Sequence, residues 1–219
     1  MISFDDIKNN QEVRTYIQQA DDTLKALGYT EHSFAHVTKV AARAEYILTT
    51  LGYSKREVNL AKIAAYLHDI GNLVNRIEHS QTGGIMAFSL LRELGMEPED
   101  ISQVVTAIGN HDEGTGVPVN PIAAALILAD KSDVRRSRVR NQDITTFDMH
   151  DRVNYSVERD ELTISSDGTY ILLDLTVNTQ YGSVMDYFEI FLERMILCRK
   201  AADVLGLRFK MVMNGQSVL

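Results

Sequence analysis

Five of the six histidines of the chain lie within its first 130 residues, and two of the aspartates there follow long apolar segments. The clearest pair is His68-Asp69, at the end of such a segment. A carboxylate at the end of a buried helix is costly unless it is neutralised or paired, and a metal ion would satisfy both side chains. Asp130-Lys131 repeats the pattern after the apolar residues 122–129. We expect these two helix ends to converge.

The other histidines of this region lie beside further predicted helices. His36 stands at the edge of the apolar stripe of a helix predicted over about residues 31–50. His32 lies one turn earlier on the same side, so both imidazoles could reach one site. His79 precedes a third periodic segment, and His111 follows the next one.

The candidate metal ligands share imidazole or carboxylate chemistry, and each comes from the end or flank of a helix, as in the metal sites of helical bundles. They are His32, His36, His68, Asp69, His79, His111 and Asp130. Such ligands without a thiolate suit manganese, iron, nickel, cobalt or zinc, and magnesium where oxygen ligands dominate. We therefore predict one or two divalent metal ions, and two ions that share a carboxylate fit the number of ligands better.

The composition excludes several classes of protein. The 219 residues are 45% apolar, which is enough for the core of one or two domains. The formal net charge of −8 argues against general nucleic-acid binding. No apolar run approaches the roughly 18 residues of a membrane span, and the N-terminus lacks a signal-peptide pattern. The single cysteine, Cys198, excludes an internal disulfide. We expect a cytoplasmic protein without membrane contact.

Helical periodicity dominates residues 1–142, for which we predict a mostly α domain built as a helical bundle. Residues 3–26 predict one amphipathic helix that ends before Gly28. Ser54 and Glu57 form a capping-box pattern at the start of the helix that leads to the His-Asp pair.

From about residue 143 the apolar residues alternate, which predicts a small α+β domain over residues 143–219. We expect three antiparallel strands, with a hairpin at Asp167-Gly168, then a long helix that begins after Ser183, and a final strand. The alternating runs are 153–157, 162–164 and 171–177. The sheet could cover the metal site, bind an effector or form a homodimer interface. His150-Asp151 is a second doublet in a polar stretch, and we interpret it as incidental.

The order His36, His68-Asp69, Asp130 resembles the signature of the HD-domain metal-dependent phosphohydrolase superfamily over about residues 30–140. The resemblance implies a helical HD domain in which these four residues hold the first metal. It further implies that Asp69 bridges to a second metal.

Other parts of the sequence resemble particular branches of that superfamily. His79 and His111 match the extra histidines of members that hold two metals, and His32 matches a further ligand of some HD-GYP members. Asp112 and the loop that follows it are also similar to HD-GYP proteins, although Asp112 replaces a histidine of their pattern. The residues around Lys131 resemble those of dinucleoside-polyphosphate hydrolases of the HD type.

The resemblance implies hydrolysis of a phosphoester in a small phosphorylated or nucleotide substrate. Water between two metals would have a lowered pKa and would serve as the attacking hydroxide. The predicted catalytic residues are Asp69, which bridges the metals, and Lys131. The predicted phosphate-binding residues are basic, since arginine suits phosphate oxygens, and they are Lys131, Arg135, Arg136 and Arg76. Basic residues near a helix end are also what the helix dipole alone would favour.

Two alternative functions are considered besides the phosphohydrolase. Some HD-superfamily enzymes use the same ligands for two irons and are oxygenases, and the ligand set does not separate them from hydrolases. A non-catalytic nucleotide-binding sensor is the other alternative. The complete set of ligands argues against the sensor, because loss of a ligand would be its simplest signature.

Overall fold

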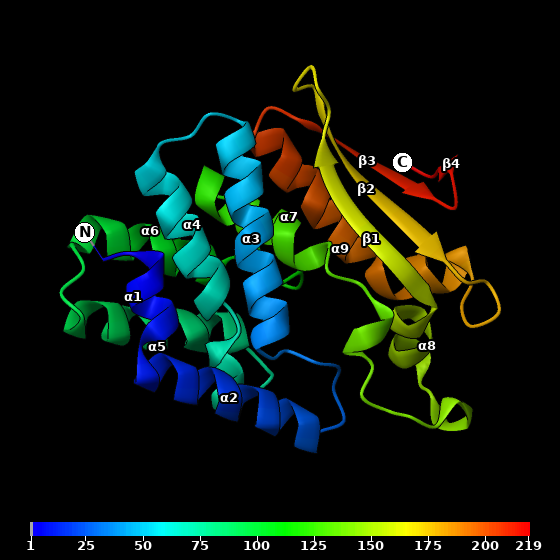
Figure 1. The fold of residues 1–219 in the computed structure, drawn as a ribbon, viewed down its shortest axis with the longest axis horizontal. Helices are drawn as coiled ribbons and strands as arrows, with labels where there is room; N and C mark the ends of the chain where they lie inside the picture. Colours follow the sequence, from blue (N-terminus) through cyan, green and yellow to red (C-terminus); the bar gives the residue numbers. More distant parts are fainter. Residues whose placement is uncertain (1) are drawn as a thin grey trace.

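The computed structural model describes residues 2–219, which form a helical part and a small sheet that carries a long helix (Figure 1). The helices of the first part are α1 (Phe4–Asn9), α2 (Gln11–Ala26), α3 (Phe34–Thr50), α4 (Lys55–Leu67), α5 (His79–Glu93), α6 (Pro98–Gly109) and α7 (Pro121–Lys131), with a 3-10 helix η1 (Ile70–Leu73) after α4. The second part contains α8 (Met149–Ser156), β1 (Val157–Ile164), β2 (Tyr170–Val177), α9 (Val184–Val204), β3 (Arg208–Met213) and β4 (Gln216–Ser217). The predicted fold class, mostly α with a small α+β region, is confirmed.

Helix α7 is the buried centre of the helical part. All its residues from Ile122 to Lys131 are buried, and α3, α4, α6 and α9 contact it. Apolar residues on every face make this position favourable for the helix. Asn120 caps its start, since the Asn120 side chain accepts a hydrogen bond from the backbone N–H of Ala123. The helix therefore carries Asp130 and Lys131 into the interior.

The starts of the other helices follow local signals. The predicted capping box of α4 is confirmed: the Ser54 hydroxyl accepts from the Glu57 N–H, and the Glu57 carboxylate accepts from the Ser54 N–H at 2.9 Å. Residues 3–26 form two helices in place of the single predicted one. The reason is that Asn10 has an extended backbone and its side chain caps α2.

The sheet has the strand order β1-β2-β3-β4. Strands β1 and β2 are antiparallel across the predicted hairpin, where Gly168 has φ of 67°. Strands β2 and β3 are parallel, because α9 returns the chain to the end of the sheet at which β2 begins. The predicted antiparallel pairing is thus observed for β1 and β2, whereas β3, the strand after the long helix, is parallel to β2.

One predicted strand is a helix. Residues 153–157 alternate in polarity, but α8 covers this segment up to Ser156, and a single strand then runs from Val157. Asp148 caps α8 by accepting from the backbone N–H of Asp151. Val153 and Ser156 are buried at a three-residue spacing, which places them on one helix face. A short run of alternating residues is therefore compatible both with the two-residue period of a strand and with the 3.6-residue period of a helix.

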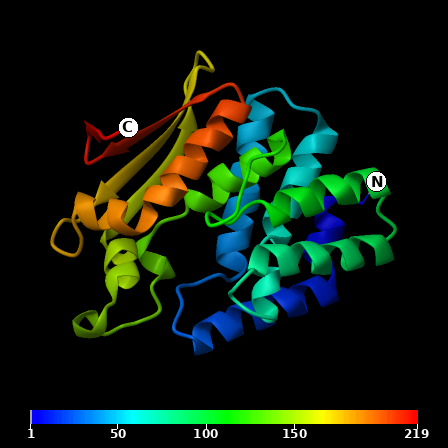
Figure 2. The same cartoon turned by 180° about the vertical axis from the view of Figure 1, so that it is seen from behind.

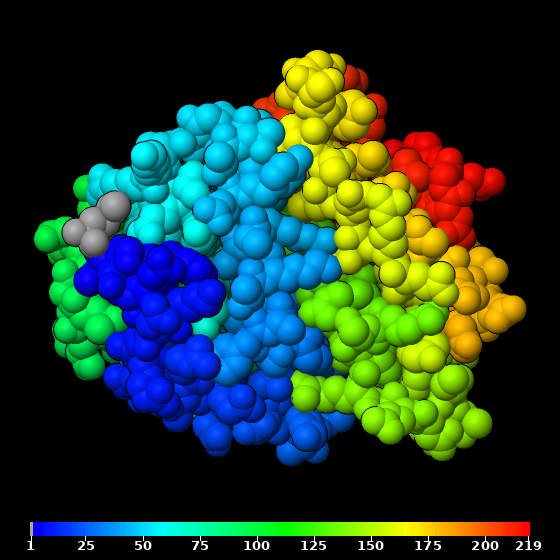
Figure 3. Space-filling model, viewed as in Figure 1, coloured from blue at the N-terminus to red at the C-terminus, as the bar shows by residue number. Residues whose placement is uncertain are grey.

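The helical part and the sheet pack closely against each other. Helix α9 lies on one face of the sheet and contacts α7 (Figure 2). Helix α3 lies beside β1 (Figures 1 and 3), where Lys39 and Arg43 both pair with Asp160. A cluster of buried apolar residues extends from the helices to β3. The predicted boundary at residue 143 falls in the connection between α7 and α8.

No helix in the described part of the chain has the length and hydrophobicity that a membrane span requires.

A close contact between η1 and α5 places the His-Asp pair against His79. A Cβ atom on Gly71 would overlap the carbonyl oxygen of His79 and would lie 2.5 Å from the backbone nitrogen of Gly83. Backbone atoms cannot give way as a flexible side chain can, so this position requires glycine.

We predict that Gly71→Ala destabilises the protein by about 1–3 kcal/mol, because overpacking forces η1 and α5 apart. The measurement is urea unfolding with a chelator present, so that metal binding does not contribute. Gly109→Ala is the matched control, since its Cβ would meet nothing closer than 3.8 Å. Equal stability of the two variants would contradict the assigned role of this contact.

Candidate metal centre

The histidines at helix ends share one hydrogen-bonding pattern. The Nδ1 atom of His68 lies 2.8 Å from the carbonyl oxygen of Ala65, and Nδ1 of His111 lies 2.6 Å from that of Ile108. These carbonyls belong to the last turns of α4 and α6, and that of Ile108 also accepts from the backbone N–H of His111 at 3.4 Å. Because a carbonyl oxygen only accepts, Nδ1 carries the proton and Nε2 presents a lone pair. The helix ends thus prepare both rings to bind a cation.

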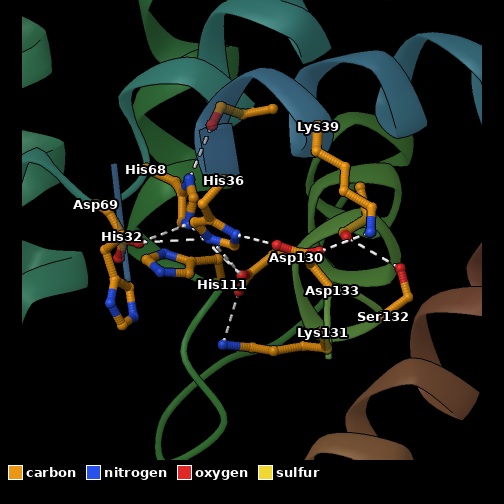
Figure 4. A network of polar contacts seen from close by, with 12 residues as sticks. His32, His36, Lys39, His68, Asp69, His111, Asp130, Lys131, Ser132 and Asp133 are labelled. Carbon is orange, nitrogen blue, oxygen red and sulfur yellow. Dashed lines mark hydrogen bonds and ion pairs between the residues drawn. The ribbon is translucent and has the colours of Figure 1, made fainter. Parts of the chain in front are cut away.

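In His36 a carboxylate, in place of a backbone carbonyl, accepts the hydrogen bond from Nδ1 and leaves Nε2 as the ligand atom. It lies on α3 and is fully buried, and its Nδ1 is 2.7 Å from Oδ2 of Asp133 (Figure 4). Asp133 is itself buried and also forms an ion pair with Lys39, whose Nζ lies 2.9 Å from Oδ1 of Asp133. A carboxylate on the outer nitrogen of a histidine fixes the ring and increases its basicity as a ligand. The sequence pattern gave no sign of this contact of Asp133, because 97 residues separate it from His36.

The first ligand group consists of His36, His68 and Asp130, whose ligand atoms lie within 4.8 Å of one another. Nε2 of His36 is 3.3 Å from Oδ1 of Asp130 and 3.6 Å from Oδ2 of Asp69. The Nε2 atoms of His36 and His68 are buried without a hydrogen-bond partner among residues 2–219. Buried, unpaired lone pairs beside carboxylates fit a bound divalent cation.

The second ligand group adjoins the first and consists of His68, Asp69 and His111. Nε2 of His79 lies 3.2 Å from Nε2 of His111 and 3.6 Å from Oδ1 of Asp69. Nδ1 of His79 faces the carbonyl oxygen of Arg76 at 3.1 Å, so two lone pairs face each other. A shared cation removes their repulsion, since two nitrogens at about 2.1 Å from one ion lie roughly 3 Å apart. The two groups share His68, and Asp69 of the second group lies 3.6 Å from Nε2 of His36 in the first.

The charges of the site favour a bound cation. Burial opposes ionisation of Asp69 and Asp130, but His68 and, for Asp130, also Lys131 hold the pKa of each carboxyl well below its usual range. Burial opposes a charge on His68 as well, yet the two carboxylates raise its pKa to about 10. Burial lowers the pKa of His111, so this ring stays neutral. Two ionised carboxylates beside the neutral ring of His111 suit a divalent metal, which would displace the proton that the carboxylates hold on His68.

Lys131 pairs with carboxylates on two sides. Its Nζ lies 2.9 Å from Oδ2 of Asp130 and 2.7 Å from Oε2 of Glu113. Burial opposes the charge of Lys131, but the two carboxylates raise its pKa. Arg194 of α9 donates to Oε1 of Glu113 at 2.8 Å. The C-terminal part of the chain therefore contributes a cation to the site, which the sequence pattern did not indicate.

Asn72 and Arg76 complete the wall on the side of the His-Asp pair. The Asn72 amide donates to Oδ1 of Asp69 at 3.0 Å and to its backbone oxygen at 2.9 Å. Nη1 of Arg76 lies 3.4 Å from Nε2 of His79 and 3.3 Å from Oδ1 of Asn72. The predicted phosphate-binding residue Arg76 is therefore brought to the site.

His32 lies beside the ligands but in a loop. Helix α3 begins at Phe34 with Ser33 as its cap, so the predicted helical position of His32 is wrong. The His32 ring lies 5.6 Å from the His36 ring, centroid to centroid, and its Nδ1 faces the carbonyl oxygen of Thr30 at 2.7 Å. Among the described residues, His32 belongs to neither of the two ligand groups.

Two of the predicted phosphate-binding arginines are not brought to the site. Arg135 pairs with Asp133 and Glu31. Arg136 pairs with Glu158 and lies over the ring of Tyr155. Glu31 and Glu158 lie 104 and 22 residues away from their arginines, so the spacing after Asp130 could not reveal them. The basic residues that line the pocket at the ligands are Arg76, Lys131, Arg138 and Arg194.

We predict that Asp133→Asn weakens metal binding about 10–100-fold, as loss of a carboxylate behind a metal-bound histidine typically does. Asparagine keeps the shape of the side chain but removes the charge that orients His36. The measurement is competition with a coloured chelator. Asp203→Asn, an exposed change on α9, serves as the control. Unchanged affinity in Asp133→Asn would contradict this positioning role.

Comparisons with known proteins show the family of the chain. An uncharacterized protein of Methanocaldococcus jannaschii is 26% identical over 203 residues, which cover 82% of this chain and 77% of that protein. A solved structure of a predicted HD superfamily hydrolase from an uncultured Thermotogales bacterium is 21% identical, with a TM-score of 0.43, and covers 58% of this chain and 71% of that one. A family model described as HD domain matches residues 33–146, which span helices α3 to α7 and more than half of the chain. The chain therefore belongs to the HD domain family.

Proposed function

We propose that this protein is a metal-dependent phosphohydrolase that cleaves a phosphoester of a small phosphorylated or nucleotide substrate. The observation that carries the proposal is the pair of adjoining ligand groups, of which Asp69, His111 and Asp130 line one pocket with three arginines. Ligands for two cations beside guanidinium groups match the needs of phosphoryl transfer, in which charge on the phosphoryl oxygens must be balanced.

The residues that would hold the metals are those of the two groups together with His79. His36, His68 and Asp130 would hold one ion, and His79 and His111 the other, with Asp69 between them. When bound, divalent ions supply Lewis-acid activation of water and neutralise charge on the substrate phosphate. The nitrogen and oxygen ligands fit manganese, iron, cobalt, nickel or zinc better than magnesium.

The protein's own cations would orient the substrate. Arg76, Arg138 and Arg194 line the pocket at the ligands and can donate to phosphate oxygens, which guanidinium groups bind in pairs. Lys131 is held by Asp130 and Glu113, so its contribution is to fix Asp130 and to balance the buried charge. Asn72 fixes Asp69 in the same way through its amide hydrogen bond.

We predict that the protein purified without chelator contains about two equivalents of transition metal and hydrolyses p-nitrophenyl phosphate. Asp69→Ala should lose metal and at least about 100-fold in kcat/KM, because both sites share this carboxylate. Metal analysis and an activity assay, with Asp203→Ala as the exposed control, check both expectations. A wild-type protein that takes up no metal after incubation with manganese or iron would contradict the proposal.

We further predict that Arg76→Gln lowers kcat/KM for phosphoesters about 10–100-fold while the metal content stays unchanged, because a charge-assisted bond to the phosphate is lost. Arg136→Gln is the matched control, since this arginine faces Glu158 outside the pocket. It should change kcat/KM by no more than about 2-fold. The opposite ranking of the two variants would show that the basic segment after Asp130 binds the phosphate.

A further inference from the structure

A cleft of about 400 Å³ lies next to the metal centre and shares four lining residues with it, namely His32, Arg76, Arg138 and Arg194. Its other walls come from the loop after α2, from α8, from α9 and from Glu113, whose carboxylate is paired with Lys131 and Arg194. Figures 1 and 2 both show the α2–α3 loop and α8 on the same side of the molecule. The volume is at the lower end of the roughly 300–1,000 Å³ that small-molecule sites occupy. It suits a ligand the size of a monosaccharide or a nucleoside.

The end of the cleft at the metal centre is basic. The guanidinium of Arg76 makes polar contacts with the uncharged groups of Asn72 and His79 and lies 5.8 Å from the ring centroid of Tyr29. The guanidinium of Arg194 lies 4.3 Å from the ring centroid of Phe191. Cations supported by aromatic rings keep N–H groups available for an anion.

The far end of the cleft is acidic. It is formed by the first turn of α8, where Asp148 and Asp151 line the wall together with His150 and Asn154. Oδ1 of Asp148 accepts from the backbone N–H of Asp151, and Oδ2 of Asp151 lies 3.5 Å from the Asn141 amide. Burial and the neighbouring Asp148 raise the pKa of Asp151.

The two ends therefore differ in the ligand groups that they accept. Carboxylates accept hydrogen bonds from hydroxyl groups and repel a phosphate. The side chains of His150 and Asn154 both donate and accept, which suits a hydroxyl better than a purely donating ammonium group. The doublet His150-Asp151, interpreted from the sequence as incidental, thus lies in the wall of the cleft.

We propose that the cleft binds a phosphomonoester of a neutral, hydroxyl-rich alcohol in a single orientation. The phosphate lies at Arg76, Arg138 and Arg194 beside the metal centre, and the hydroxyl groups lie at Asp148 and Asp151. A compound with phosphate at both ends is rejected, because its second phosphate would face the two carboxylates. This inference rests on the proposed phosphohydrolase function and names the class of its substrate.

The test compares four phosphoesters: ribose 5-phosphate, ribose 1,5-bisphosphate, phosphoethanolamine and p-nitrophenyl phosphate. Wild-type protein should prefer ribose 5-phosphate to the bisphosphate and to phosphoethanolamine by at least about 10-fold in kcat/KM. The double variant Asp148→Asn/Asp151→Asn should raise the KM for ribose 5-phosphate about 10-fold and should accept the bisphosphate better. Its kcat/KM for p-nitrophenyl phosphate should fall by a smaller factor than that for ribose 5-phosphate, because that ester has no hydroxyl groups for the far end.

The double variant is suited to this test because asparagine caps a helix as well as aspartate does, so α8 keeps its cap at residue 148. Asp143→Asn, in the same connection but outside the cleft, is the matched control. Equal losses on all four esters, or a wild-type preference for the bisphosphate or for phosphoethanolamine, would overturn the inference.

Calorimetry separates this inference from the proposed function. If no ester is hydrolysed, the phosphohydrolase proposal fails, but binding of ribose 5-phosphate to the metal-loaded protein still tests the cleft. The assignment is supported if the double variant binds ribose 5-phosphate about 10-fold more weakly than the wild-type protein does, and if the wild-type protein binds the bisphosphate more weakly than ribose 5-phosphate. Absence of binding by the wild-type protein contradicts it.

Discussion

The burial of two ionised carboxylates in an apolar core is the constraint on which the structure depends. Asp69 and Asp130 are at most 9% exposed, and Asp130 follows the apolar residues of α7 immediately before Lys131 ends the helix. Such charges are tolerated only when cations or hydrogen-bond donors surround them. The histidines, Lys131 and Asn72 fulfil this requirement in part, and divalent metals would complete it.

The backbone prepares the site before any ligand arrives. Carbonyls at the ends of α4 and α6 accept hydrogen bonds from Nδ1 of His68 and His111, and each ring then points its Nε2 inward. The contact at Gly71 holds η1 against α5 and so brings His79 to the pair. Helix geometry, more than side-chain chemistry, therefore decides which nitrogen can act as ligand.

Ion pairs couple the site to the C-terminal part of the chain. Lys39 bridges Asp133, behind His36, to Asp160 of β1. On the opposite side, Lys131 and Arg194 meet at Glu113. Because these charged groups are largely buried, a shift of the sheet or of α9 would alter the surroundings of the ligands. The sheet thus supports the site and, through α9, supplies part of the cleft.

The amino-acid sequence by itself determined the helical class, the start of α4, the buried helix before Asp130 and the types of ligand. These features depend on local periodicity, caps and charge, which neighbouring residues specify. The tertiary structure decided which groups meet. It placed Asp133 behind His36, brought Arg194 into the pocket, and turned Arg136 to Glu158. Such contacts join residues far apart in the chain, and an arginine pairs with whichever carboxylate the packing brings within reach. Polarity patterns record burial, but they do not record the partner of a charged group.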